Sequence, residues 1–361
     1  MRPAPLMFTT SSSRIRFILF AVATIVSLRA QTPDWKLVTR ETDFDPRDSS
    51  GEMVFKDHLW LLGGWFNSYE TPPRDVWKSA DGIHWEIVTS RAAWKHSDLP
   101  MTVVFQDRMW LMGGWYNGRL QNNGASDQVW SSIDGKKWDL VTEHAGWSPR
   151  LAGALVVLHG KLWMMGGAEK YYFGKDSEYC NDVWSSGDGK TWTRVTAAAP
   201  WAPRGYHQGL AFDGKLWIMG GGKYLPDYKH YNDVWSSPDG VNWTEVTSKA
   251  AWEPRLWFPA VVYRNRMWIM GGWSRNPANP LPGYTDYRKE GTSDNMMANW
   301  NDVWHSADGK KWEQLQTKTV WKTRHEHSAY VFQDKLWVTA GHTWPLVNDV
   351  WVLDLPKSWG K

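Results

Sequence analysis

Cysteine is almost absent from the 361 residues, and Cys180 is the single example. One thiol excludes an internal disulfide, so stability must come from packing.

A surplus of charge is also missing once the N-terminal segment is set aside. Four of the 41 Lys and Arg residues lie in 1–30, and removing them leaves 37 basic against 38 acidic residues. A near-neutral chain without a basic block has no sequence feature that indicates binding to nucleic acid or to an anionic membrane.

Long apolar runs are missing except near the N-terminus. The run FILFAVATIVSL (17–28) follows Arg14 and Arg16, and its 12 residues are too few to cross a bilayer unaided. We interpret 1–30 as a secretory signal peptide cut near Ala30, which predicts a secreted or periplasmic protein without stable membrane insertion after cleavage. An uncleaved membrane anchor is the alternative.

What the sequence does have is repetition. The peptide DVWKSADGIHW (75–85) recurs with few changes. Its further copies occupy 128–138, 182–192, 233–243 and 302–312, and a copy without Asp-Gly occupies 349–359. Repetition at about 50 residues is typical of propellers and solenoids.

A second marker, an apolar run that ends in Gly-Gly, accompanies each repeat. Its copies occupy 59–64, 109–114, 162–167, 216–221 and 267–272, with a sixth, LWVTAG, at 336–341. Together with the Val-rich stretch before it and the two Trp-containing segments after it, each unit predicts four short antiparallel strands, a to d. The Asp-Gly pair suits the tight turn from c to d, because Gly supplies positive φ.

The ends of the chain predict how the ring closes. Trp35 to Thr39 matches strand d but precedes the first unit, whereas the last unit runs out of chain after Trp359. The N-terminal strand is therefore expected to complete the last blade and to remove exposed edges. We predict an all-β, six-bladed propeller over 31–361 as one domain, and a monomer.

The loop lengths indicate which face of the propeller carries the binding site. From the strand-d Trp to the second marker the spacing is 28 residues in every unit, so length variation falls in the b–c connection, which is longest at 273–301. In a four-stranded meander the b–c and d–a connections lie on the same face. Long loops on a rigid scaffold are frequent binding sites.

These Gly-Gly, Pro-Arg and Trp positions resemble the kelch repeat. The resemblance covers nearly all of 31–361 and implies the propeller fold of a family that includes galactose oxidase and bacterial N-acetylneuraminate epimerase. Function does not follow from the fold alone. The copper site of a galactose oxidase would need Tyr and His ligands. The only candidate residues for such a site in this sequence are Tyr206, His207 and Cys180. We expect no metal or other cofactor.

An arginine recurs twelve residues after the strand-d Trp. It is Arg47, Arg150, Arg204, Arg255 and Arg324, with Ser97 in the second unit. One interpretation is a ring of guanidinium groups that binds a carboxylate at the channel mouth. The other is that each Arg pairs with local carbonyls or with the Asp before the strand-c Trp, namely Asp75, Asp182, Asp233, Asp302 or Asp349.

Departures from the repeat are candidate site residues. His207 and His327 stand three residues beyond the Arg position in two units only, and Glu326 adjoins His327. We take these three as candidate catalytic residues, because His and Glu can exchange protons near neutral pH. A hydrogen-bonded structural His is the alternative.

Six of the 30 Trp residues lie outside the recurring positions: Trp65, Trp115, Trp257, Trp273, Trp300 and Trp344. Trp65, Trp115 and Trp273 directly follow Gly-Gly, where His342 stands in the last unit. Exposed rings there would stack on a sugar, and packing under the long loops is the alternative.

Three hypotheses follow for function. The first is a propeller that binds a carbohydrate or a partner protein through its loop face. The second is an acidic-sugar mutarotase or epimerase, as the family resemblance implies, with Arg324, Glu326, His327 and His207 at its site. The third is a copper oxidase, which the sparse ligands disfavour.

Overall fold

The computed structural model of the chain describes residues 1, 33–171, 178–224, 228–275, 297–343, 345–357 and 359. The chain divides into two compact units, Met1–Gln31 and Thr32–Lys361, and every strand of the described residues lies in the second. The predicted signal peptide falls outside the described residues apart from Met1. Within the described ranges, no helix has the length and apolar character needed to cross a membrane.

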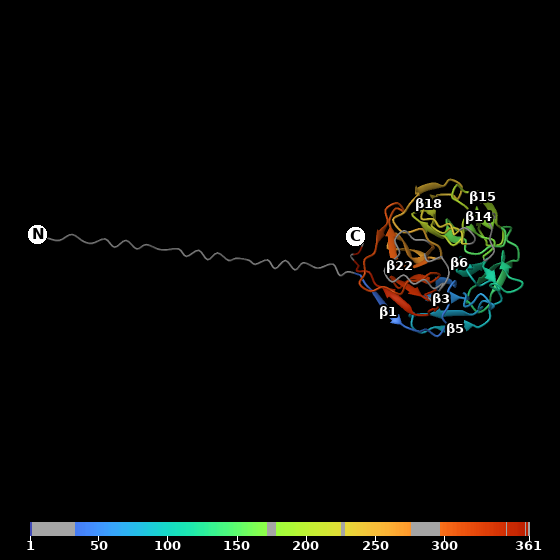
Figure 1. The fold of residues 1–361 in the computed structure, drawn as a ribbon, viewed down its shortest axis with the longest axis horizontal. Coiled ribbons are helices and arrows are strands. Elements are labelled where there is room, and N and C mark those ends of the chain that lie inside the picture. Colours follow the sequence, from blue (N-terminus) through green and yellow to red (C-terminus); the bar gives the residue numbers. More distant parts are fainter. Residues whose placement is uncertain are drawn as a thin grey trace. The chain divides into compact units, whose positions relative to one another are not determined.

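Six four-stranded antiparallel sheets form the blades of a ring (Figure 1). Blade 1 consists of β2 (Gly51–Phe55), β3 (His58–Leu62), β4 (Val76–Ser79) and β5 (Glu86–Thr89). Blade 2 consists of β6 (Met101–Phe105), β7 (Arg108–Met112), β10 (Val129–Ser132) and β11 (Asp139–Thr142). Blade 3 consists of β12 (Ala154–Leu158), β13 (Lys161–Ala168), β14 (Tyr179–Ser186) and β15 (Thr193–Thr196).

The remaining blades follow the same plan. Blade 4 consists of β16 (Gln208–Phe212), β17 (Lys215–Met219), β18 (Val234–Ser237) and β19 (Thr244–Thr247). Blade 5 consists of β20 (Ala260–Tyr263), β21 (Arg266–Arg275), β22 (Met297–Ser306) and β23 (Glu313–Gln314). Blade 6 consists of β24 (Ser328–Phe332), β25 (Lys335–Thr339), β26 (Val350–Leu353) and β1 (Trp35–Thr39). A short pair, β8 (Trp115–Tyr116) and β9 (Gly124–Ala125), lies between β7 and β10 in the chain.

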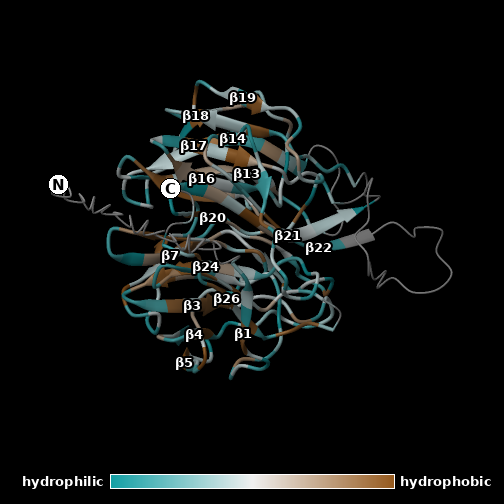
Figure 2. Cartoon of the chain, turned by 90° about the vertical axis from the view of Figure 1, so that its left-hand side faces the viewer, coloured by the Kyte–Doolittle hydropathy of each residue, from teal (hydrophilic) through white to brown (hydrophobic). Residues whose placement is uncertain are grey.

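The N-terminal strand closes the ring, as the sequence predicted. β1 pairs antiparallel with β26, with Trp35 opposite Leu353, and the two strands lie side by side in Figure 2. Trp35 is buried in one core with Trp268 and Trp321. The all-β, six-bladed architecture is therefore confirmed, including the strand that the last blade borrows from the start of the chain.

The first strand of each blade faces the centre of the ring. These strands contact one another in a closed circle, in the order β2, β6, β12, β16, β20 and β24. They surround a central channel, which contains a cavity of about 410 Å³. In blade 5, β21 and β22 are 10 residues long and project beyond the other blades on one side (Figure 2).

The recurrent Asp-Gly turn has a packing role between blades. Gly240 has a φ of +75°, and a Cβ there would lie 2.5 Å from the Trp163 ring of the preceding blade. The Asp239 side chain accepts hydrogen bonds from the backbone N–H groups of Val241 and Asn242 at 2.9 and 2.8 Å. This motif therefore serves the contact between blades, where only Gly fits.

Candidate functional site

A closed ring of backbone hydrogen bonds surrounds the channel mouth. In each d–a connection, the residue two positions after the Arg position donates its N–H to the carbonyl of its counterpart in the preceding blade, at 2.9 to 3.3 Å. The six residues are Ser49, Leu99, Ala152, Tyr206, Trp257 and Glu326. All have φ between 51° and 58°, a left-handed conformation that costs a non-Gly residue about 1–3 kcal/mol. The hydrogen bonds offset that cost and hold six different side chains around one opening.

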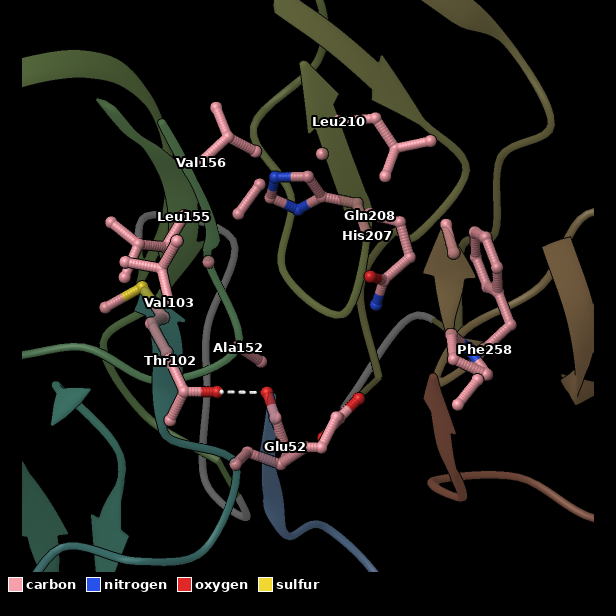
Figure 3. Close-up of a pocket in the computed structure, with 18 of the residues that line it drawn as sticks. Glu52, Thr102, Val103, Ala152, Leu155, Val156, His207, Gln208, Leu210 and Phe258 are labelled. Carbon is pink, nitrogen blue, oxygen red and sulfur yellow. Dashed lines mark hydrogen bonds between the residues drawn. The ribbon is translucent and has the colours of Figure 1, made fainter. Parts of the chain in front are cut away.

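The cavity continues from this ring along the inner strands. Figure 3 shows Glu52 and Thr102 on one side and His207, Gln208 and Phe258 on the other. Thr102 Oγ1 donates a hydrogen bond of 3.1 Å to the Glu52 carbonyl oxygen. Burial raises the pKa of the Glu52 carboxyl to about 8, which favours its neutral form at pH 7. No Lys or Arg is among the described residues that line the cavity.

Three carboxyl groups lie close together near the mouth, and of these Glu326 lines the cavity. Asp48, Asp98 and Glu326 are all buried, and burial raises the pKa of each. The negative charge of Asp48 raises the pKa of Asp98 further, and Asp48 and Asp98 do the same for Glu326. Ser49 Oγ donates to Asp48 Oδ1 at 3.1 Å. Within the described part of the chain, neither carboxyl oxygen of Asp98 has a partner at ordinary hydrogen-bond geometry, and the nearby Ser49 hydroxyl lowers the pKa of this carboxyl only in part.

Two histidines extend this acidic side. His342 Nδ1 lies 2.9 Å from Asp48 Oδ2, and His325 Nε2 lies 3.4 Å from Glu326 Oε2. The two imidazole rings are stacked with centroids 4.8 Å apart. Burial, with the nearby His342 and His327, lowers the pKa of His325 well below its ordinary value, so its imidazole is neutral at pH 7.

Aromatic rings lie next to this acidic side, where Trp257 stacks on His325 with ring centroids 5.3 Å apart. Tyr206 and Trp257 both line the cavity, with ring centroids 5.1 Å apart. Tyr224 lies 4.8 Å from Trp257 and 5.8 Å from Trp273, so the two mouth residues belong to a larger aromatic cluster. The mouth thus has a carboxyl-rich half and an aromatic half.

The predicted aromatic platform is wrong for two of its three Trp residues. Trp115 is 2% exposed and Trp273 is 0% exposed, and neither is among the residues that line the cavity, so neither offers a ring face to a ligand there. They pack beneath the loops, which was the alternative, and Trp115 Nε1 donates to the Gly118 carbonyl at 2.9 Å. Trp65 is partly exposed and stacks on His342 with centroids 6.0 Å apart. Trp344 and most of the long blade-5 loop lie outside the described residues.

The structure brings the three candidate catalytic residues to one cavity. Glu326, His207 and His327 all line it. His207 Nε2 lies 3.1 Å from the Met165 carbonyl oxygen, and burial lowers the pKa of His207 to about 3. Burial and the charge of Arg324 lower the pKa of His327 well below its ordinary value. Both histidines are therefore neutral at pH 7, and Glu326 is the stronger candidate for proton transfer.

Of the two interpretations of the recurrent arginines, the structure shows the pairing with aspartate. Arg255 is fully buried, and its guanidinium donates to both carboxyl oxygens of Asp302 and to the Gly271 carbonyl. Arg47, Arg150, Arg204 and Arg324 make the same bidentate contact with Asp75, Asp182, Asp233 and Asp349. Each Asp also accepts from the following strand-c Trp, as in Trp304 Nε1 to Asp302 at 2.7 Å. We therefore leave these arginines out of the ligand site.

Sequence reasoning missed Asp48, Asp98, Tyr206 and Ser49 as members of the mouth. A signal was present, since Asp48 and Asp98 stand directly after the Arg position, where blades 3 and 5 have Leu. A charged residue at a position that is apolar in other repeats departs from the structural pattern. Without the fold, nothing indicated that this position is buried.

The described residues do not form a metal site of the usual kind. No group of three or more His, Cys, Asp or Glu side chains among them could hold a metal ion. Burial raises the pKa of the Cys180 thiol to about 11, so it is not a thiolate at neutral pH.

Comparison with known proteins supports the fold. No family model matches the chain. The dynein alpha chain of the flagellar outer arm of Chlamydomonas reinhardtii is 28% identical over 232 residues, which are 58% of this chain and 5% of that protein. The chain thus spans a small part of the length of this relative. A solved structure described as "Structure of YjhT" has a TM-score of 0.66 at 15% identity and covers 88% of this chain and 97% of its own. This likeness, with the six blades, shows a kelch-like propeller.

Proposed function

We propose that the channel mouth binds a neutral carbohydrate. Its carboxyl-rich half has Glu326 on the cavity wall, with Asp48 and Asp98 buried close to it, as hydrogen-bond partners for sugar hydroxyls. Its aromatic half offers Tyr206 and Trp257 as apolar surface for the C–H face of a pyranose ring. A polyhydroxylated ligand with one polar edge and one apolar face matches both halves.

The charges around the cavity favour a neutral sugar over an acidic one. No Lys or Arg lines the cavity among the described residues, and the recurrent arginines are already paired with aspartate. A carboxylate ligand would instead lie near the negative charge of Asp48, which already raises the pKa of Asp98 and Glu326. Like charges in a site of low dielectric constant repel strongly.

The proposal rests mainly on the buried carboxyl group of Asp98. A buried polar group that lacks a hydrogen-bond partner costs about 1–3 kcal/mol of stability. In blades 3 and 5 the same position holds Leu151 and Leu256, which are 0% exposed. The fold therefore accepts an apolar residue there, and a partnerless carboxyl group is explained by a ligand that completes its hydrogen bonds.

We expect Asp98→Leu to raise the free energy of unfolding by about 1–3 kcal/mol, because it removes a partnerless buried acid. The same variant should lower the affinity for a neutral oligosaccharide by about tenfold or more, because the sugar loses a hydrogen-bond partner. Urea denaturation and calorimetric titration with hits from a neutral glycan array measure the two effects.

The matched control is Glu86→Gln, which removes a carboxylate from the exposed edge strand of blade 1 and should leave both quantities unchanged. A variant Asp98→Leu that is less stable and binds normally would show that Asp98 is structural. Absence of any glycan binding by the unaltered protein would overturn the proposal and favour a partner protein at this face.

A second candidate function is proton transfer on the bound sugar, as in a mutarotase. It rests on Glu326, whose pKa is raised by burial and by the neighbouring acids, as suits a group that gives and takes a proton. We expect Glu326→Gln to keep sugar binding within about threefold, since the amide still forms hydrogen bonds. It should abolish any acceleration of anomer exchange, measured by NMR. Equal exchange rates with and without the protein would leave binding as the sole function.

The proposal also assigns the protein to an exported location. Residues 1–30 support export, because a short apolar run follows two arginines and precedes a small residue at Ala30. Extracellular or periplasmic glycans would then be the accessible ligands. A partner protein on the loop face stays the alternative occupant.

A further inference from the structure

A cluster of three basic side chains lies on the loop face between blades 1 and 2, away from the channel lining. Arg74 comes from the b–c connection of blade 1, and Arg91 and Lys95 come from the connection that leads into blade 2. Together with Thr71, Ser90 and Tyr116 they line one hollow, and no carboxylate lines it among the described residues. We call these six residues the basic hollow.

None of the three cations forms an ion pair within the described part of the chain, although other surface Lys and Arg residues do. Lys78 pairs with Glu86, for example, and Arg264 pairs with Asp334. Burial and the charge of Arg91 lower the pKa of Arg74, which shows that the two guanidinium groups are close. Like charges held together without a counter-charge favour binding of an anion.

Hydrogen bonds fix the two backbone segments that carry the three cations. The Ala92 N–H donates to the Arg74 carbonyl at 2.7 Å, and Ser97 Oγ donates to the Pro73 carbonyl at 2.6 Å. These bonds join the two segments that supply the basic side chains. Thr71 Oγ1 donates to Asn117 at 3.1 Å and so ties the same loop to blade 2.

Arg74 also departs from the repeat. Four blades have Asn at this position, namely Asn181, Asn232, Asn301 and Asn348. These amides serve the blade, as where Asn232 donates to the Ala250 and Trp252 carbonyls at 3.1 and 2.8 Å. Blade 1 has in its place a guanidinium that forms no ion pair with any described residue. A residue that abandons the structural role at its position is a candidate for binding.

We propose that the basic hollow binds an oxyanion, the sulfate ester or carboxylate of a glycan. Two guanidinium forks and an ammonium suit such a group, and the hydroxyls of Ser90 and Tyr116 add hydrogen bonds. The choice of a glycan rests on the proposed function of the channel mouth, which lies on the same face. The near-neutral chain argues against nucleic acid, which needs a longer basic surface.

The test measures binding of three polymers with one backbone, namely dextran sulfate, carboxymethyl dextran and dextran, by calorimetry at 0.15 M salt. The protein should bind one or both charged polymers and should prefer them to dextran. Combined Arg74→Gln, Arg91→Gln and Lys95→Gln should weaken that binding about tenfold or more, because each charged hydrogen bond contributes substantially. The polymer whose binding falls most identifies sulfate or carboxylate as the ligand group.

The matched control replaces Lys136, Lys161 and Lys215 by Gln, which removes the same charge from the opposite face. It should change the affinity less than about twofold at this ionic strength. Equal losses in both triple variants, no loss in the first, or no binding of either charged polymer would overturn the proposal. Preference for single-stranded DNA over both charged dextrans, lost in the first variant, would assign the hollow to nucleic acid instead.

The two proposals fail separately. Asp98→Leu alters the channel mouth and should leave binding of the charged dextrans unchanged. The triple Gln variant of the basic hollow should leave binding of a neutral oligosaccharide unchanged. Loss of both activities in either variant would show that the two sites are not independent.

Discussion

Replacing Asp302 by Gln is expected to lower the free energy of unfolding by about 3–5 kcal/mol, because it leaves the buried Arg255 charge without its counter-ion. Arg255 is 0% exposed and Asp302 has 7% of its side chain exposed, so water cannot take over the role of the carboxylate. The guanidinium would keep its hydrogen bonds to the Glu253 and Gly271 carbonyls and its position over the Trp300 ring, none of which supplies a negative charge. Urea denaturation of the purified protein measures the loss.

Blade 2 supplies a matched control for this result. It has Ser97 and Gln128 where the other blades have Arg and Asp, and Gln128 still accepts from Trp130 Nε1 at 3.2 Å. The double variant Arg255→Ser, Asp302→Gln copies that pair into blade 5. We expect it to be more stable than Asp302→Gln alone, because no buried charge is left uncompensated. Additive losses in the double variant would show that the ion pair itself is not what stabilises the blade.

Trp35→Ala is expected to destabilise the protein by about 3–5 kcal/mol, the usual cost of deleting a buried Trp side chain. Trp35 is 2% exposed, and its ring meets the Trp321 ring edge-on with centroids 6.1 Å apart. Loss of this anchor weakens the one strand that closes the ring and exposes the edge of β26. Thermal unfolding should therefore shift down, and light scattering should show association of the opened chains.

Lys36→Ala is the control on the same strand. Lys36 is exposed, so its loss should change stability by less than about 0.5 kcal/mol. If Trp35→Ala were as mild as this control, closure by β1 would contribute little to stability. The pairing of Trp35 with Leu353 would then be a consequence of folding and not one of its requirements.

At the channel mouth, the backbone of each repeat has a structural role, whereas its side chain is available for ligand binding. Every blade places a left-handed residue in the hydrogen-bonded ring, and the backbone contacts are the same in all six. The side chains at those positions share no chemistry, from Ala152 to Trp257 and Glu326. The ring of hydrogen bonds offsets the energetic cost of the left-handed conformation. The side chain at each position can therefore vary with its role in binding.

The recurrent arginine shows where sequence reasoning stops. Its spacing is visible in the sequence, and so is the Asp that accompanies it, because blade 2 lacks both. Whether the guanidinium faces the channel or the Asp depends on contacts between segments 25 to 47 residues apart. Those contacts were decided by the tertiary structure, and they favoured the aspartate.

The sequence by itself determined the number of blades, the order of strands and the closing strand, because turns and strand patterns are local and each is repeated six times. Only the tertiary structure decided that Trp115 and Trp273 are buried, and that Asp48 and Asp98 lie close to Glu326 at the channel cavity. The same holds for Arg74, Arg91 and Lys95 around the basic hollow. Burial and charge clustering depend on which distant segments pack together, and periodicity along the chain does not encode that information.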